Sequence, residues 1–141
     1  MTWIALRRTM LVTDAATVGS MLGLLLAARP SAAAEDPGEP LYRQTCATCH
    51  MTDGTGVPGL QPAIDKSAIL AGDPGRLIRL LLRGPAQSLA PNRVHYANKM
   101  PTFEALADAE IADVLNYARR AFAKRPAAIT PAQVAAIRAK P

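Results

Sequence analysis

The chain has 141 residues, of which half are hydrophobic and 19% are charged. This length and composition favour one folded domain, and they exclude a long disordered chain and a large multidomain enzyme. The net charge of +5 arises from 16 basic residues scattered among 11 acidic ones, which indicates a mildly basic, solvated surface and no nucleic-acid partner.

Residues 1–34 are typical of a secretory signal. A positive head carries Arg7 and Arg8, an apolar stretch of 14 residues follows, and three alanines precede Glu35. The apolar stretch is shorter than the roughly 20 residues of a membrane-spanning helix, so we expect cleavage rather than retention as an anchor. The general secretory route and the twin-arginine route stay open. Either route predicts a mature periplasmic protein that meets a membrane only through a partner.

The sequence after Glu35 predicts helices and no strands, because no segment alternates between polar and apolar residues. The segments with helical spacing of apolar residues are 40–48, 74–83, 108–122 and 131–139. Asp73 and Thr130 are the predicted N-caps of two of these helices, since each precedes a proline at the first helical position. The predicted fold class is therefore all-α.

Two long segments, 51–64 and 84–103, are predicted to be loops. Both contain several prolines or glycines and neither has a helical period. Long loops in a small domain usually carry function, so these two are expected to wrap a ligand. We divide the chain into the signal segment, a folded domain over 35–125 and a C-terminal extension over 126–141 with a short helix.

The strongest chemical signal is Cys46-Ala47-Thr48-Cys49-His50. In the pattern C-x-x-C-H, two thiols one helical turn apart attach haem covalently, and the histidine binds its iron. Three alternatives are weaker. A thioredoxin-like pair would follow a strand, a structural zinc ion needs a fourth ligand for which only distant His95 remains, and a disulfide would close a very small loop.

The second axial ligand of the iron is also open to argument. After removal of the signal segment, Met51 and Met100 are the two available thioethers. Met51 directly follows His50 and cannot easily reach the opposite face of a haem, whereas Met100 ends the second predicted loop. We expect Met100, with the loop imidazole of His95 as the competing ligand, which would lower the reduction potential.

The mature chain resembles class I cytochrome c over about residues 38–122. Gly38 and Tyr42 resemble the small-and-aromatic pair that packs the first helix of that family across the last, where Leu115 and Tyr117 stand in this sequence. The resemblance implies three to five helices wrapped around one covalently bound haem c.

Two further elements carry the resemblance. Pro62-Ala63-Ile64 resembles a Pro-x-Leu element whose proline carbonyl accepts a hydrogen bond from the ligand histidine. Met100-Pro101, followed by Phe103, resembles the loop of the axial methionine. The resemblance implies haem attachment to Cys46 and Cys49, iron ligation by His50 and Met100, and pocket or supporting roles for Tyr42, Pro62, Ile64 and Phe103.

The sequence departs from the family at two positions that are not expected ligands. Met51 stands where many relatives have Gly, and Ala107 stands where relatives often have a capping Ser. An alanine N-cap costs about 1 kcal/mol, part of which Asp108 is expected to recover. The basic run from Arg119 to Arg125 is either a solvated helix end or a docking patch for an acidic partner.

These observations predict an electron carrier rather than an enzyme, because two axial ligands leave the iron no vacant site. Segments 56–62, 73–79, 81–84 and 129–138 resemble haem domains of dehydrogenase cytochrome subunits. The implied donor is an alcohol, sugar, aldehyde or molybdenum-dependent dehydrogenase, and the implied acceptor is a respiratory cytochrome or oxidase. Two alternatives stay open: a haem protein whose labile Met100 admits peroxide or a small gas, and an assembly role for the extension and the basic run.

Overall fold

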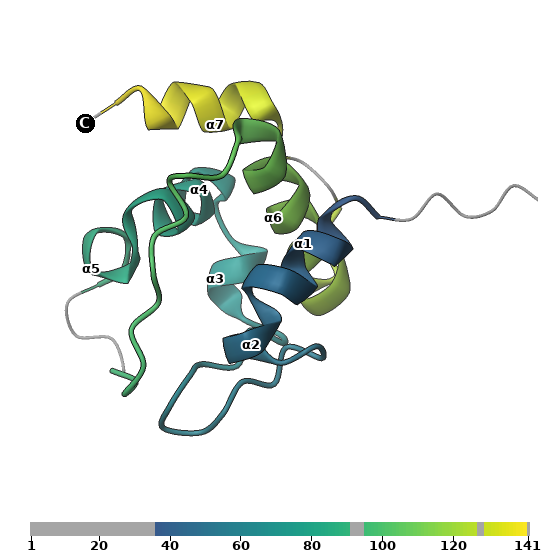
Figure 1. The fold of residues 1–141 in the computed structure, drawn as a ribbon, viewed down its shortest axis with the longest axis vertical. Coiled ribbons are helices and arrows are strands. Elements are labelled where there is room, and N and C mark those ends of the chain that lie inside the picture. Colours follow the sequence, from purple (N-terminus) through teal and green to yellow (C-terminus); the bar gives the residue numbers. More distant parts are fainter. Residues whose placement is uncertain (1–35, 91–94, 127–128, 141) are drawn as a thin grey trace, which may run out of the picture. The chain divides into compact units, whose positions relative to one another are not determined.

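A computed structural model describes residues 36–90, 95–126 and 129–140, all within a compact unit that spans 34–141. The predicted signal segment lies outside the described residues. The described part is helical, with one isolated β-bridge between Val57 and Gln61, which confirms the all-α class (Figure 1). Its helices are α1 (Gly38–Thr45), α2 (Ala47–His50), α3 (Ala68–Ala71), α4 (Pro74–Arg83), α5 (Pro85–Ser88), α6 (Asp108–Ala123) and α7 (Pro131–Arg138). Within these ranges no helix is both long enough and apolar enough to cross a membrane.

The helix predicted over 40–48 is wrong at both ends, because the structure has two helices there. α1 begins earlier, since the Asp36 carboxylate accepts a hydrogen bond from the Gly38 N–H at 3.1 Å. The chain breaks at Cys46, whose φ of −104° departs from the α-helical value near −63°. α2 then carries the second cysteine and the histidine of the C-x-x-C-H motif.

The predictions for α4, α6 and α7 are confirmed, with ends that differ by at most one residue. The Asp73 carboxylate accepts hydrogen bonds from Gly75 N–H and Arg76 N–H, at 3.2 and 2.8 Å. The Thr130 hydroxyl accepts from Gln133 N–H at 3.3 Å. Both helix starts therefore follow from local sequence, since a cap satisfies backbone donors that have no partner within the helix.

Two single-turn helices, α3 and α5, were not predicted. α5 lies inside the segment 84–103, which was expected to be a loop throughout. α3 starts where the Ser67 hydroxyl accepts from Leu70 N–H at 3.4 Å. Each has four residues, so neither can display the 3.6-residue periodicity on which helix prediction rests.

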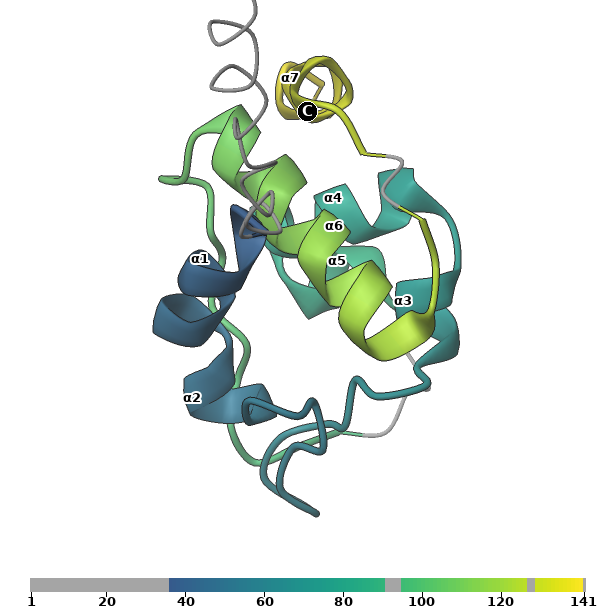
Figure 2. The same ribbon diagram turned by 90° about the vertical axis from the view of Figure 1, so that its right-hand side faces the viewer.

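The centre of the fold is the crossing of α1 over α6 (Figures 1 and 2). A Cβ atom at Gly38 would lie 2.1 Å from the backbone oxygen of Asp113, so only glycine allows the helices to approach this closely. Tyr42 is 1% exposed, and its ring centroid lies 5.3 Å from that of Tyr117 and 5.1 Å from that of Phe122. The predicted packing of the first helix on the last is confirmed at Gly38, Tyr42 and Tyr117.

The C-terminal extension belongs to the same core. α7 packs on α4 and α6, and Figure 2 shows it nearly end-on beside them. Val134 of α7 is fully buried, and Ile129 before it is 4% exposed. Asn116 of α6 holds the backbone of Ile129 from both sides, as donor to its carbonyl (2.8 Å) and acceptor from its N–H (3.1 Å).

The cap predicted at the start of α6 is wrong in its details. Glu110, not Asp108, reaches back to the unpartnered backbone, where its carboxylate accepts from the Ala107 N–H at 2.8 Å. The Asp108 carboxylate instead accepts from Nε of Arg138 in α7 at 2.8 Å. Asp108 is thus used in a long-range contact rather than in a local cap.

The basic run at the end of α6 is neither a fully solvated helix end nor one continuous patch. Arg119 is 6% exposed, and its Nη1 donates to the carbonyls of Leu70 and Gly72, each at 2.9 Å. Its position on α6 turns it toward α3, so it holds that short helix in place. Lys124 and Arg125 are exposed, but the buried Arg119 is unavailable to a partner.

Candidate functional site

A cavity of about 710 Å³ gathers residues from helices α1 to α6 and from both long segments. Its walls are mainly apolar. Six of the predicted site residues line it, namely Tyr42, Cys46, His50, Pro62, Ile64 and Met100. The other two predicted residues, Cys49 and Phe103, are half-buried beside it rather than in its lining.

The two cysteines flank the start of α2, and both are free thiols. Burial raises the pKa of the Cys46 thiol, although a contact with the Thr45 hydroxyl at 3.3 Å opposes that shift. Redox-active C-x-x-C pairs need a lowered thiol pKa, because the thiolate is the nucleophile. The raised pKa of the Cys46 thiol therefore disfavours the thioredoxin-like alternative.

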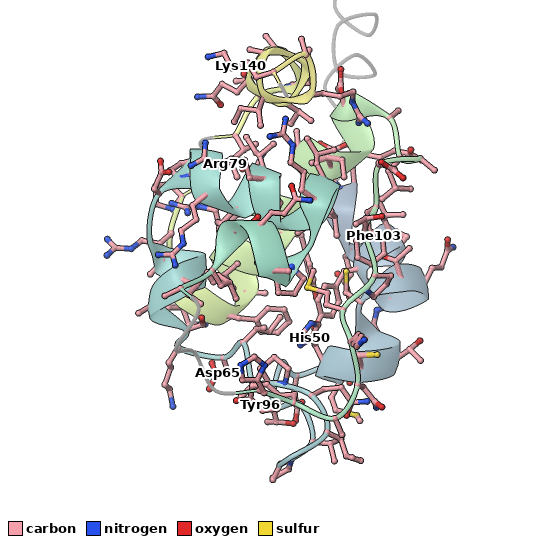
Figure 3. All side chains as sticks on the ribbon, turned by 90° about the vertical axis from the view of Figure 1, so that its left-hand side faces the viewer. His50, Asp65, Arg79, Tyr96, Phe103 and Lys140 are labelled. Carbon is pink, nitrogen blue, oxygen red and sulfur yellow. The ribbon has the colours of Figure 1, made fainter. Side chains whose placement is uncertain are left out.

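The imidazole of His50 is held in one tautomer. Its Nδ1 lies 2.9 Å from the carbonyl oxygen of Pro62. A carbonyl can only accept, so Nδ1 carries the proton and donates. The lone pair of Nε2 is then available to a metal, and the hydrogen bond to Nδ1 makes the imidazole a better ligand. In Figure 3 the His50 ring points from α2 toward the interior.

Gly56 makes room for that Pro62 carbonyl. A Cβ atom at Gly56 would lie 2.5 Å from the Pro62 oxygen, and the glycine φ of +62° is one that other residues rarely adopt. Gly56 N–H also donates to the carbonyl of His50 at 3.1 Å. The segment after α2 therefore folds back beneath the imidazole, and Ile64 N–H closes it with a bond to Gly54 O at 2.8 Å.

Met51 lies outside the cavity lining, in a strained backbone conformation. Its φ of 63° and ψ of 163° fall in a region that glycine adopts far more easily than any residue with a side chain. The Tyr42 hydroxyl donates to the Met51 carbonyl at 2.7 Å. Burial raises the pKa of Tyr42 above its ordinary value, so the hydroxyl keeps its proton and remains a donor at neutral pH.

Met100 is half-buried and lines the cavity from the segment before α6. Backbone hydrogen bonds fix this segment on both sides of Met100. Before it, Ala97 N–H donates to the carbonyl of Gly59 at 3.0 Å, and after it, Phe103 N–H donates to the carbonyl of Leu81 at 2.8 Å. Phe103 thus anchors the methionine segment to α4 rather than lining the cavity.

His95, the competing ligand, also lines the cavity, but it is exposed. The residues just before it, 91–94, lie outside the described part of the chain. Among the described residues, no group of three or more His, Cys, Asp or Glu side chains is arranged to hold a metal ion.

Several cavity residues were not singled out by the sequence. Leu70 comes from the unpredicted α3, and Arg83 lies at the end of α4, where its guanidinium also donates to the α7 carbonyl of Ile137 at 3.1 Å. Leu81 lies in the segment 74–83, which the sequence identified only as a helix with regularly spaced apolar residues. The one signal that pointed to the loop geometry is the glycine and proline content of segment 56–62, which includes Gly56.

Comparisons with known proteins agree with this geometry. A family model described as Cytochrome c matches residues 35–122. The chain is 36% identical over 88 residues to the cytochrome c subunit of a quinone alcohol dehydrogenase from Gluconobacter oxydans, covering 59% of this chain and 18% of that protein. It is 39% identical over 90 residues to cytochrome c-552 of Thermus thermophilus, covering 61% and 60%. It is 34% identical over 108 residues to the gluconate 2-dehydrogenase cytochrome c subunit of Pantoea cypripedii, covering 72% and 24%. The chain therefore spans less than two thirds of the length of each of these relatives.

Proposed function

The chain belongs to the cytochrome c family, and on that premise we propose that it is an exported carrier of single electrons between redox proteins. Members of this family hold haem c, which Cys46 and Cys49 attach covalently in this chain. Bound haem supplies an iron that cycles between the ferric and ferrous states. The role of the protein is to hold the haem, keep water away from it and supply its axial ligands.

The residues that are present fit this group. The cavity of about 710 Å³ is walled mainly by apolar side chains, as a large flat hydrophobic cofactor requires. Cys46 lines it, Cys49 lies one helical turn further on, and both thiols are free. His50 lines the cavity with its Nδ1 already occupied as a donor.

The proposed axial ligands are His50 and Met100. The observation that carries the proposal is the hydrogen bond from His50 Nδ1 to the Pro62 carbonyl at 2.9 Å, because it leaves the Nε2 lone pair available to a metal. Met100 reaches the same cavity from a segment 50 residues further along the chain. Two protein ligands leave no coordination position for a substrate, so electron transfer is favoured over catalysis at the iron.

The proposed donor is a dehydrogenase that oxidises an alcohol, sugar or aldehyde or uses molybdenum, and the proposed acceptor is a respiratory cytochrome or oxidase. Support comes from relatives named as cytochrome c subunits of alcohol and gluconate dehydrogenases. The chain contains a single C-x-x-C-H motif, which corresponds to one haem and to the transfer of one electron in each encounter with a redox partner.

Export is supported by the signal-like residues 1–34 and is tested by the intact mass of the protein expressed with its own leader and purified from periplasm. We expect a mass equal to the chain from near Glu35 plus one haem. A full-length chain retained at the membrane would contradict cleavage, and a mass without haem would contradict the cofactor.

Met100→Ala tests the ligation. We expect the variant to retain covalent haem, to lose the Met-to-iron charge-transfer band of the oxidised protein, to bind added imidazole and to have a lower reduction potential, because thioether ligation raises that potential. Met51→Leu is the matched control, since it removes the other thioether outside the cavity, and its spectrum should equal that of the unmodified protein.

His95→Ala separates the two candidate ligands. We expect it to leave the spectrum unchanged. If Met100→Ala leaves the absorption spectrum unchanged and His95→Ala alters it, His95 is the ligand. The reduction potential should then be lower than that expected for ligation by Met100. If the unmodified protein itself binds imidazole or carbon monoxide readily, the peroxide- or gas-binding alternative replaces the electron carrier.

A further inference from the structure

We propose that Arg138, in the C-terminal extension, is a positioning residue for Met100. The inference rests on the proposed function, because it takes Met100 to be an iron ligand. Arg138 lies beyond residues 35–122, where the family match ends, and its side chain reaches back to the segment that follows Met100. The extension would then do more than cover the core, because it would hold the segment that carries Met100 in the position in which Met100 binds the iron.

The guanidinium of Arg138 uses three of its nitrogens on one short stretch of chain. Nη1 donates to the carbonyl of Glu104 at 2.6 Å, and Nη2 donates to the carbonyl of Leu106 at 2.7 Å. Nε donates to the carboxylate of Asp108 at 2.8 Å. The guanidinium therefore spans the whole connection between Phe103 and α6.

This connection has limited apolar burial. Glu104, Ala105 and Ala107 are exposed, and only Leu106 within it packs against the core. Its start is fixed by Phe103 N–H on the Leu81 carbonyl, its middle by Leu106 N–H on the Phe103 carbonyl at 3.1 Å, and its end by the Ala107 N–H on the Glu110 carboxylate. Arg138 supplies the hydrogen bonds that join the carbonyls of this stretch to α7. Their loss would loosen the stretch and with it the anchor of Phe103 on Leu81, which fixes the segment that carries Met100.

α7 is a firm base for such a clamp. Val134 is fully buried in the same helix, and Arg83 donates to the carbonyl of Ile137 in its last turn and to that of Lys140 just beyond it. Arg83 also lines the cavity, so α7 is tied both to the methionine segment and to the cavity wall. Figure 3 labels Phe103, which precedes the stretch that Arg138 contacts, and Lys140, which follows α7.

These three contacts depend on the shape of the guanidinium and not on its positive charge alone. The planar guanidinium satisfies two carbonyls and a carboxylate at once from separate nitrogens in a fixed arrangement, whereas the ammonium of lysine is a single compact donor that does not reproduce this arrangement. The clamp is therefore expected to fail in Arg138→Lys almost as completely as in Arg138→Gln.

The test measures how often Met100 leaves the iron. Added imidazole binds the oxidised holoprotein only when Met100 has left, so its apparent affinity reports the open fraction. We expect Arg138→Gln to bind imidazole about tenfold more tightly than the unmodified protein, the change that ~1.4 kcal/mol of lost closure produces. Backbone hydrogen exchange at Phe103 should quicken in parallel.

Arg120→Gln is the matched control. Arg120 also binds an aspartate, Asp36, from a helix, and its side chain is 38% exposed against 33% for Arg138. Its side-chain hydrogen bonds within the described part of the chain go to Asp36 and not to residues 104–108, so imidazole affinity should stay that of the unmodified protein. Equal affinities in the two glutamine variants, or full rescue by Arg138→Lys, would overturn the clamp. A Met-to-iron band that is absent from the unmodified protein would instead overturn the proposed function.

Discussion

At the scale of single residues, the orientation of the candidate iron ligand depends on one proton and the backbone carbonyl that accepts it. His50 Nδ1 donates to Pro62, and Gly56 gives the Pro62 carbonyl the space it needs. The sequence predicted the His50–Pro62 pair by resemblance, yet nothing local to Arg119 or Arg138 predicted their roles. Both arginines bond to carbonyls of segments 30 to 50 residues away, which the order of side chains along one helix cannot reveal.

The strained backbone at Met51 gives the first residue-scale prediction. Met51→Gly is expected to raise the free energy of unfolding of the holoprotein by about 1 kcal/mol. Relief of the unfavourable φ and ψ stabilises the folded state by about 1–3 kcal/mol. Part of this gain is lost, because glycine gives the unfolded chain greater conformational entropy. Denaturant unfolding followed by haem absorbance measures the change.

Thr52→Gly is the control for Met51→Gly. Thr52 is the exposed neighbour of Met51 and is not among the residues with positive φ, so glycine there should cost up to about 1 kcal/mol. The strain interpretation fails if Met51→Gly unfolds at the same denaturant concentration as the unmodified protein or at a lower one.

At the scale of elements, prediction succeeded where local signals were strong. α4 and α7 have a capping side chain followed by proline, and α6 has a long amphipathic period, so their limits could be predicted. The break at Cys46 and the single-turn helices α3 and α5 could not. Elements that short are stabilised by the residues packed against them, such as Arg119 on α3, rather than by their own sequence.

The loop after α2 provides an element-scale prediction. Gly56 and Gly59 have φ values of +62° and +77°, so alanine strains the backbone at either position. Only at Gly56 would the new Cβ meet the Pro62 oxygen, whereas at Gly59 no heavy atom lies within 4 Å. Gly56→Ala should therefore destabilise the holoprotein by roughly 1–3 kcal/mol more than Gly59→Ala.

The measurement for this pair combines denaturant unfolding with the NMR signal of the His50 Nδ1 proton. That signal should shift in Gly56→Ala, because the accepting carbonyl must move, and should stay in place in Gly59→Ala. Equal losses of stability with an unmoved proton signal would show that the loop does not support the imidazole through Gly56.

At the scale of the whole molecule, the cavity links the stability of the fold to the cofactor. Its lining is mainly apolar, so haem bound there would bury apolar surface, and such burial is the main favourable contribution to folding. The aromatic cluster of Tyr42, Tyr117 and Phe122 lies at one helix crossing and does not fill it. The haem is thus expected to act as part of the core.

The double substitution Cys46→Ala with Cys49→Ala tests this whole-molecule prediction. We expect it to abolish covalent haem and, with it, stable folding, as measured by far-ultraviolet circular dichroism and thermal unfolding. Cys49→Ala alone retains one attachment point at Cys46 and should keep haem and helical structure. A double variant that is free of haem, helical and cooperatively folded would contradict the role of haem as core.

The sequence by itself determined the haem-attachment motif, the all-α class and the helices α4, α6 and α7, because each depends on residues within a few positions of one another. The tertiary structure alone decided the shape of the cavity, the burial of Arg119 and the reach of Arg138 across to Glu104 and Leu106. These features join segments far apart in the chain. Their formation depends on the packing of α1, α4 and α7 around α6, where burial and backbone hydrogen bonding, rather than local propensity, fix which groups meet.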